Sequence, residues 1–429
     1  SPGALLLEGR EVVAAGTPQS IGAVEGVRRI DEPGAVLLPG MVNAHAHLDL
    51  TPLEPRPFGG KFEAWLQSIL DLRAGQRAGG TLRVDTQLGI ELSLAGGVAF
   101  VGDIAGVGQT EPALAFRESA LGGVSFIECF GLGDRQDESI RQIQAVLDSV
   151  PEFGNGVRVG ISPHAPYTCG PEVYAYACST GRPVATHLAE SLEEEEFLRD
   201  GSGPFRRLSE RMQAWNDGVV IPDCHPVEAL RGVLGTRPLL LVHLNYVGSS
   251  HIELIAERGG MVAYCPRASD YFGHPRNDRA AHRYREMLDA GVKIGLGVDG
   301  SASNDSAHML NEARQAMLLQ RVMRTADTMT AREALYMATA GGASVLNRDD
   351  IGRLVTGYSA DIAAFDRRVI DFAGSDWDPV ASLLLCGPVR ANYTIINGKP
   401  VVSEGQLTTM PIDRILQNHR RLSHGLMTR

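Results

Sequence analysis

The chain has 429 residues, of which 44% are hydrophobic and 21% are charged, the balance expected of a soluble globular protein. Its formal net charge of -11 argues against broad binding to nucleic acids or anionic membranes, because no cationic excess is present to neutralise phosphates. No apolar run is long enough to span a bilayer, and the first residues lack the features of a secretory signal. The six scattered cysteines form no Cys-x-x-Cys pair, which fits a reducing, cytoplasmic compartment.

Short strands are predicted at both ends of the chain. They cover residues 4–7, 11–15 and 35–38 at one end and 361–365, 391–396 and 399–403 at the other, where Asn397-Gly398 predicts a hairpin turn. Neither end is long enough for a comfortable domain of its own. We therefore expect residues 1–39 and 356–410 to form one small composite β-sandwich, followed by a basic helical tail at 411–429.

The long middle segment alternates between strands and helices. Helical patterns, such as 138–149, 226–233, 251–258 and 281–290, separate most of the apolar runs. The pattern predicts an α/β protein with a (β/α)8 TIM barrel over residues 40–355. An open doubly wound sheet is the alternative, but it usually shows a glycine-rich phosphate turn after strand one, and no GxGxxG occurs. The eight predicted strands are 41–47, 98–103, 124–130, 157–162, 183–187, 238–243, 261–265 and 293–299.

Four of these strands end in residues that bind metals. Strand one carries His45 and His47, which share one face because side chains at positions i and i+2 point the same way. Strands five and six end in His187 and His243, and strand eight ends in Asp299. A single histidine at a strand end is more often structural. Functional side chains of such barrels gather at the carboxyl ends of the strands, so the four endings together predict a metal site.

These motifs resemble the amidohydrolase superfamily, and in particular its mononuclear deaminase and chlorohydrolase branch. The resemblance rests on His45-x-His47 after Pro39-Gly40, on the runs 186–190 and 299–304, and on Val242-His243. The run 196–205 is similar to members that act on S-adenosylhomocysteine or aminodeoxyfutalosine. Two positions depart from the family pattern: Val298 and Gly300 stand where Thr and Ser are common.

The predicted centre holds one divalent metal ion, most simply Zn2+, with Fe2+ and Mn2+ as alternatives. A single ion is implied because strand four ends in Ile161-Ser162-Pro163-His164 and offers no lysine that could be carbamylated. The predicted ligands are His45, His47, His187 and Asp299.

Three residues are predicted to act in catalysis. Asp299 would accept a proton from the activated water, and Glu190, three residues after His187, would carry protons to the substrate. The alternative for Glu190 is a carboxylate that stabilises a helix N-terminus. The resemblance places His243 beside the water and the developing charge, with direct metal ligation as its alternative.

Four further residues are candidates for substrate binding. Ser303 could bind the heterocycle, and His164 a ribose or a ring edge. Trp65 could cover the pocket and Arg199 could bind a carboxylate. Three of them have a plainer structural interpretation: His164 as a turn residue, Trp65 as a packing residue of a helix, and Arg199 as a solvated helix residue.

The sequence therefore predicts a metal-dependent hydrolytic deaminase of an aminated purine in an adenosine-like nucleoside, such as adenosine, S-adenosylhomocysteine or aminodeoxyfutalosine. The runner-up is hydrolysis of another aromatic C–N or C–Cl bond, in guanine, cytosine or triazine substrates, and a non-catalytic barrel ranks last. The motifs of cytidine-type zinc deaminases, H-E-x-x-H metalloproteases and G-x-S-x-G hydrolases are absent from the sequence. A small molecule is the expected partner, and pairing as a homodimer is a further expectation.

Overall fold

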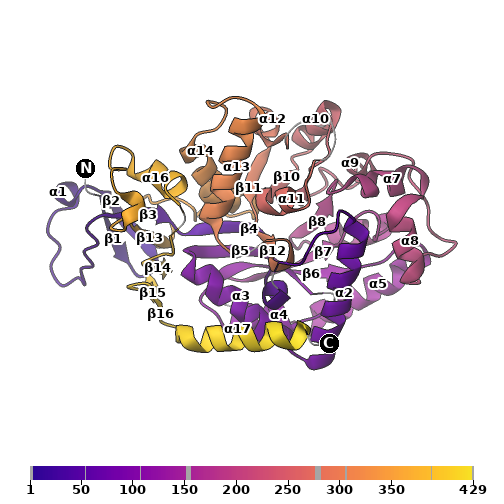
Figure 1. Cartoon of the computed structure of the whole chain (residues 1–429), viewed down its shortest axis with the longest axis horizontal. Coiled ribbons are helices and arrows are strands. Elements are labelled where there is room, and N and C mark those ends of the chain that lie inside the picture. The colour runs from indigo at the N-terminus through magenta and orange to yellow at the C-terminus, as the bar shows by residue number, and fades with distance from the viewer. Residues whose placement is uncertain are drawn as a thin grey trace.

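The computed structural model describes residues 3–53, 55–106, 108–150, 156–275, 282–304, 307–387 and 389–427. Its centre is a parallel sheet of nine strands, visible across the middle of Figure 1. The order of the strands in space follows their order in the chain from β4 to β11, and β12 lies on the other side of β4. The strands are β4 (Met41–His47), β5 (Val98–Ala105), β6 (Gly122–Cys129), β7 (Arg158–Pro163), β8 (Val184–Leu188), β9 (Leu239–His243), β10 (Met261–Tyr264), β11 (Lys293–Leu296) and β12 (Asp299–Gly300).

The sheet closes on itself at the short link between β11 and β12. β11 pairs with β10, whereas β12 pairs with β4. Within the link, the N–H of Gly297 donates to the carbonyl of Tyr264 at 2.8 Å, and the N–H of Val298 donates to the carbonyl of His45 at 2.9 Å. β11 and β12 are thus two parts of one eighth strand that changes partner. The predicted strand 293–299 lies in the right place but is interrupted at these two residues.

The strands are buried on both faces, as expected for a parallel sheet covered by helices. One apolar cluster contains alternate residues along the strands, such as Val124 and Phe126 of β6 and Ala263 of β10. The residues between them, such as Ile127 and Val262, belong to a larger cluster shared with the helices. This alternation explains why the strands appear in the sequence as short, nearly continuous apolar runs.

Helices follow the strands, as the sequence pattern predicts, although the helical segment expected at 226–233 extends only over Pro226–Ala229. A π-helical turn, η4 (Met337–Gly341), joins two helices near the end of the barrel. The α-helices that connect and follow the barrel strands are α2 (Phe62–Gly79), α3 (Leu82–Ala95), α4 (Glu111–Arg117), α5 (Gln136–Ser149), α6 (Pro171–Ser179), α7 (Leu192–Asp200), α8 (Gly203–Arg211), α9 (Pro226–Ala229), α10 (Ser249–Glu257), α11 (Pro266–Tyr271), α12 (Tyr284–Asp289), α13 (Met309–Met323), α14 (Ala331–Tyr336) and α15 (Gly342–Val345). Short 3-10 helices lie at η1 (Leu48–Leu53), η2 (Gly133–Arg135), η3 (Ser301–Ser303) and η5 (Ile370–Phe372).

The two ends of the chain meet in antiparallel sheets beside the barrel, at the left of Figure 1. A five-stranded sheet joins β3 to the C-terminal strands, with β3 and β13 paired along their length. At the predicted hairpin, Asn397 and Gly398 have φ angles of 51° and 75°, the left-handed values that a type I′ turn requires. The division into domains at residues 39/40 and 355/356 stays a prediction. The elements are β1 (Ala4–Glu8), β2 (Glu11–Gly16), α1 (Pro18–Ile21), β3 (Ala35–Pro39), β13 (Ile362–Asp366), α16 (Pro379–Leu385), β14 (Tyr393–Ile396), β15 (Lys399–Ser403) and β16 (Gln406–Leu407).

The tail forms one helix, α17 (Ile412–Met427), which runs along the lower side of the molecule in Figure 1. Ile415 of this helix is buried, and the hydroxyl of Ser423 donates to the carbonyl of Pro52 at 2.7 Å. The tail therefore packs against η1, the segment that directly follows His47. Within the described part of the chain, no helix combines the length and the apolar character needed to cross a membrane.

Candidate metal centre

The predicted metal ligands, from β4, β8 and β12, converge at one end of the barrel. Oδ1 of Asp299 lies 3.4 Å from Nε2 of His45 and 3.5 Å from Nε2 of His47. Nε2 of His187 lies 3.4 Å from Nε2 of His47. Ligand atoms bound at the usual zinc distances in a tetrahedron are about 3.4 Å apart, so these spacings match those of a closed ligand set.

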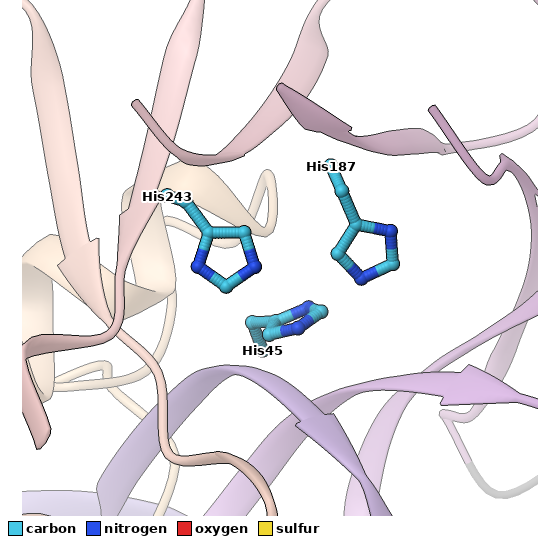
Figure 2. A group of neighbouring side chains, drawn as sticks. All are labelled: His45, His187 and His243. Carbon is cyan, nitrogen blue, oxygen red and sulfur yellow. The ribbon is translucent and has the colours of Figure 1, made fainter. Parts of the chain in front are cut away.

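The side chain of His243 faces the same space. Figure 2 shows the rings of His45, His187 and His243 turned toward one another from separate strands, and nitrogen atoms of all three lie within 4.8 Å of one another. His45 has no solvent-exposed surface, and neither of its ring nitrogens has a hydrogen-bond partner among the described residues. A buried imidazole without such a partner is costly unless another group satisfies it, and a metal ion would do so.

The hydrogen bonding of His187 sets its tautomer. Its Nδ1 lies 2.9 Å from the backbone carbonyl of His164, which can only accept, so Nδ1 carries the proton. Nε2 then presents a free electron pair to the cluster. This arrangement is typical of metal-binding histidines, whose second nitrogen is held by a carbonyl or carboxylate.

The electrostatics also fit a cation. Burial, aided by neighbouring histidines, lowers the pKa of His47 and His187 well below the ordinary value, and burial lowers the pKa of His243 to about 3. These imidazoles are therefore neutral at pH 7, the form that binds metals. Burial alone would raise the pKa of Asp299, but the imidazoles of His45 and His243 outweigh it and hold the pKa well below its usual range.

The backbone is strained at the same place. Ala189, His243, Leu244 and Asp299 have φ angles of 49°, 75°, 55° and 62°, a left-handed region that residues other than glycine seldom adopt. Strain of this kind persists only where surrounding contacts impose it, and it gathers at functional sites. Here it occurs at or directly beside the ends of β8 and β9 and at the start of β12, next to the predicted ligands.

Glu190 lies at the edge of the cluster. Its Oε1 is 3.6 Å from Nε2 of His243, and Glu190, His243 and Asp299 form a group whose polar atoms lie within 4.8 Å of one another. Burial raises the pKa of Glu190 well above its ordinary value, and the nearby carboxylates of Asp299 and Glu194 add to the effect. A carboxyl group whose pKa is raised keeps its proton to a higher pH and is better suited to donate it to a substrate.

Two of the four predicted substrate-binding residues border this cluster. The hydroxyl of Ser303 donates to Oδ2 of Asp299 and to the carbonyl of Gly300, each at 3.2 Å, so it is engaged with the predicted ligand Asp299. The ring of His164 lies 5.0 Å from that of His187, and its Nδ1 is 2.9 Å from the hydroxyl of Thr168.

The other two are not part of the cluster. Trp65 of α2 packs edge-on against Phe272, with ring centroids 4.7 Å apart, inside an aromatic group built mainly from α2, α7 and α8. The side chain of Arg199 is 64% exposed and lies 3.7 Å from Glu195 on its own helix. Their proposed contacts with substrate rest on the sequence alone.

A buried charge cluster beside His47 was not predicted. Arg73 of α2 donates to Glu128 at the end of β6 at 2.7 Å and to Asp49 at 3.3 Å, and its Nη2 lies 3.4 Å from Nδ1 of His47. Burial raises the pKa of Asp49, although the Arg73 guanidinium opposes that effect. Glu128 could have been predicted as a site residue, because it is a carboxylate at the end of an apolar strand. Arg73 could not, because it lies within a helix and interrupts no pattern.

His282 also escaped prediction. Its Nε2 donates to the backbone carbonyl of His243 at 2.7 Å, while its Nδ1 accepts from the N–H of Tyr284 at 3.1 Å. Burial lowers the pKa of His282 to about 4, so the ring is neutral. This contact supports the strained backbone of His243, and no local pattern in the sequence pointed to it.

A model of the amidohydrolase family matches residues 36–401. The chain belongs to this family, whose sequence pattern spans both the barrel and the strands that flank it.

Particular relatives are similar over nearly the whole chain. The chain is 29% identical to an 8-oxoguanine deaminase of Pseudomonas aeruginosa, across 93% of this chain and 89% of that enzyme. It is 28% identical to a 5-methylthioadenosine/S-adenosylhomocysteine deaminase of Pelotomaculum thermopropionicum, across 100% and 94% of the two chains. Among solved structures, a zinc-bound adenosine deaminase of Xanthomonas campestris superposes with a TM-score of 0.81 at 23% identity, across 100% and 94% of the chains. The zinc complex of atrazine chlorohydrolase TrzN from Arthrobacter aurescens gives 0.79 at 24% identity, across 98% and 94%.

Proposed function

We propose that this amidohydrolase is a metal-dependent deaminase that removes the amino group of a purine ring, in an adenosine-like nucleoside, by hydrolysis of the C–N bond. The observation that supports it best is the position of Glu190, 3.6 Å from His243 at the edge of the His/Asp cluster. A carboxyl group there could supply what deamination requires beyond water activation, namely protons for the ring and for the departing amine. The names of the relatives, several of which are adenosine-type deaminases, agree with this choice.

His45, His47, His187 and Asp299 would hold one divalent ion, which we propose to be Zn2+, with Fe2+ and Mn2+ as alternatives. When bound, such an ion lowers the pKa of water to ~7 and makes it a nucleophile near neutral pH. Asp299 would take the proton that the water loses. His243 would stabilise negative charge as it develops on the oxygen that attacks the ring.

Glu190 would complete the reaction. It would protonate the ring nitrogen next to the attacked carbon and then help to transfer a proton to the amino group. The carbon–nitrogen bond breaks, ammonia leaves, and the ring keeps the oxygen as a carbonyl. One water is consumed for each ammonia released.

The test is ammonia release by the zinc-loaded protein across adenosine, S-adenosylhomocysteine, 5-methylthioadenosine, aminodeoxyfutalosine, adenine, guanine and cytosine. We expect turnover of one or more adenosine-like nucleosides and little of the free bases. Activity confined to the free bases would overturn the proposed substrate class. A protein that binds no metal under any condition would overturn the enzymatic proposal.

A second candidate is hydrolysis of another aromatic C–N or C–Cl bond. The similarity to 8-oxoguanine deaminase and to the triazine hydrolase structures favours it. The same assay distinguishes the two candidate functions when 8-oxoguanine, melamine and atrazine are added as substrates. For atrazine, chloride release is measured.

The remaining proposals concern the state of the protein. We propose a cytoplasmic protein that pairs as a homodimer, takes a small-molecule substrate and binds neither nucleic acid nor membrane. Light scattering of the metal-loaded protein would measure the oligomeric state, and a monomer at micromolar concentration would contradict the pairing.

A further inference from the structure

We infer that Asn245 and Glu194 are positioning residues that hold the backbone of Glu190 and so fix the separation between the Glu190 carboxylate and the His243 imidazole. The inference rests on the proposed function, in which those two side chains act together. It adds two residues to the site that belong neither to the predicted ligands nor to the predicted proton carriers.

Glu194 holds the backbone of Glu190 from the side of α7. Its Oε2 accepts the N–H of Glu190 at 2.9 Å, and the residue is only 1% exposed. The N–H of Glu194 itself donates to the hydroxyl of Ser191, which caps the start of α7. The carboxylate therefore reaches back from a capped helix to a defined point of the preceding loop.

Asn245 holds the same residue from the opposite side. Its Nδ2 donates to the carbonyl of Glu190 at 3.0 Å, while its Oδ1 accepts from the hydroxyl of Ser269 at 2.8 Å. Both ends of the amide are thus engaged, and Asn245 and Ser269 are 5% and 2% exposed. Because the backbone carbonyl can only accept, the nitrogen of the amide must face Glu190.

The contact continues a set of bonds between the segments that follow β8 and β9. The N–H of Leu244 donates to the carbonyl of Leu188 at 3.0 Å, and the N–H of Tyr246 donates to the carbonyl of Ala189 at 3.1 Å. The side chain of Asn245 adds the next bond, at Glu190. The segment that carries His243 is therefore tied, residue by residue, to the segment that carries Glu190.

This arrangement explains how two catalytic side chains from different strands keep a fixed spacing. Misplacing a reacting group by about 1 Å costs on the order of a hundredfold in rate. Ala189, His243 and Leu244 have positive φ angles and lie where the regular ladder between β8 and β9 ends. The Asn245 and Glu194 bonds supply that support.

The decisive variant is Asn245→Asp in the metal-loaded enzyme. It keeps the size of the side chain and the acceptor for Ser269, but it turns a second oxygen toward the Glu190 carbonyl. We expect kcat to fall by about 10- to 100-fold with an unchanged KM and an unchanged metal content. Glu194→Leu should also lower kcat, and Glu194→Gln, which keeps an acceptor for the Glu190 N–H, should recover most of that loss.

Glu195→Gln is the matched control. Glu195 is a buried carboxylate on the same helix, but it lies 3.4 Å from His225 rather than against Glu190, so kcat should stay at the wild-type value. Wild-type turnover in Asn245→Asp, or an equal loss in Glu195→Gln, would overturn the inference. A loss of metal from Asn245→Asp would also overturn it. So would a change in both KM and kcat that accompanies a lower unfolding temperature. A wild-type enzyme inactive on every substrate would instead overturn the proposed function itself.

Discussion

A single guanidinium lies between two buried carboxylates next to the metal centre. The side chain of Arg73 is 7% exposed, and those of Asp49 and Glu128 are 1% exposed. Removing one member of a buried ionic group leaves charge without compensation, which costs about 3–5 kcal/mol. We therefore predict that Arg73→Met lowers the free energy of unfolding by that amount, measured by urea denaturation.

Arg77→Met is the control for this prediction, because Arg77 lies on the same helix and is exposed. Its effect should stay within about 0.5 kcal/mol. Adding Glu128→Gln to Arg73→Met should recover part of the loss, since one uncompensated charge then disappears. Equal stability of Arg73→Met and the wild type would show that the cluster does not hold α2 to the barrel.

Glu190→Gln tests the proton carrier directly. The amide has the same shape but no proton to exchange, so the metal content should stay the same while kcat falls by about 10²- to 10⁴-fold. Metal analysis and ammonia release measure the two quantities on one sample. Glu196→Gln, an exposed position on α7, the helix that follows Glu190, should behave like the wild type; full activity of Glu190→Gln would contradict the assignment.

The sequence drew attention to the predicted ligands because each is a polar residue in or at the end of an apolar strand, and the structure brings them together. Arg73 and Asn245 could not be found in this way. Their roles depend on contacts with residues distant in the chain, such as Glu128, 55 positions from Arg73, and Glu190, 55 positions from Asn245. In the sequence each has the appearance of an ordinary helix or loop residue.

At the scale of elements, α3 is joined to the segment that carries α2 by a buried carboxyl. Asp85 accepts hydrogen bonds from Gln76 at 2.9 Å and Thr81 at 2.7 Å, yet burial raises its pKa to about 6. The unfolded value is about 3.9, so the unfolded chain loses this proton first as the pH rises. The free energy of unfolding should therefore fall between about pH 4 and pH 6, by up to roughly 3 kcal/mol from this group.

Asp85→Asn cannot lose that proton. Relative to the wild type, its free energy of unfolding should rise by up to roughly 3 kcal/mol between pH 4 and pH 7, measured by urea denaturation at several pH values. Asp71→Asn, on the exposed face of α2, is the matched control and should show no such trend. A difference between Asp85→Asn and the wild type that does not change with pH would contradict the prediction.

The elements themselves differed in how well the sequence defined them. Barrel strands are buried on both faces, so each one produced a short apolar run that was recognised in place. Helix ends were less clear, as α9 shows, because a helix of one turn carries too few residues for a periodic pattern. The interruption at Gly297 and Val298 was not foreseen, since it arises from a change of hydrogen-bond partner and not from a loss of apolar character.

At the scale of the molecule, the metal centre should contribute to stability. His45 is buried without hydrogen-bond partners among the described residues, so an ion that binds the folded chain should stabilise it. Free metal at 1,000 times the dissociation constant adds about 4 kcal/mol. We predict that chelation lowers the thermal midpoint by several degrees and that zinc restores it, measured by calorimetry.

His45→Ala should respond differently. With one ligand removed, the addition of zinc should leave its thermal midpoint nearly unchanged. An identical zinc response in this variant and in the wild type would place the stabilising ion elsewhere.

The junction of β4 and β12 has a consequence for the order in which the protein is made. It joins residues far apart in the chain: Val298 donates to Asn43 across 255 positions. The ligands His45 and Asp299 lie on the two sides of this junction. During synthesis, a ribosome-bound chain that ends before residue 299 has the first ligands but not the last, and its barrel is still open. Capture of the proposed metal ion by the complete ligand set must therefore wait until the final barrel strand has emerged.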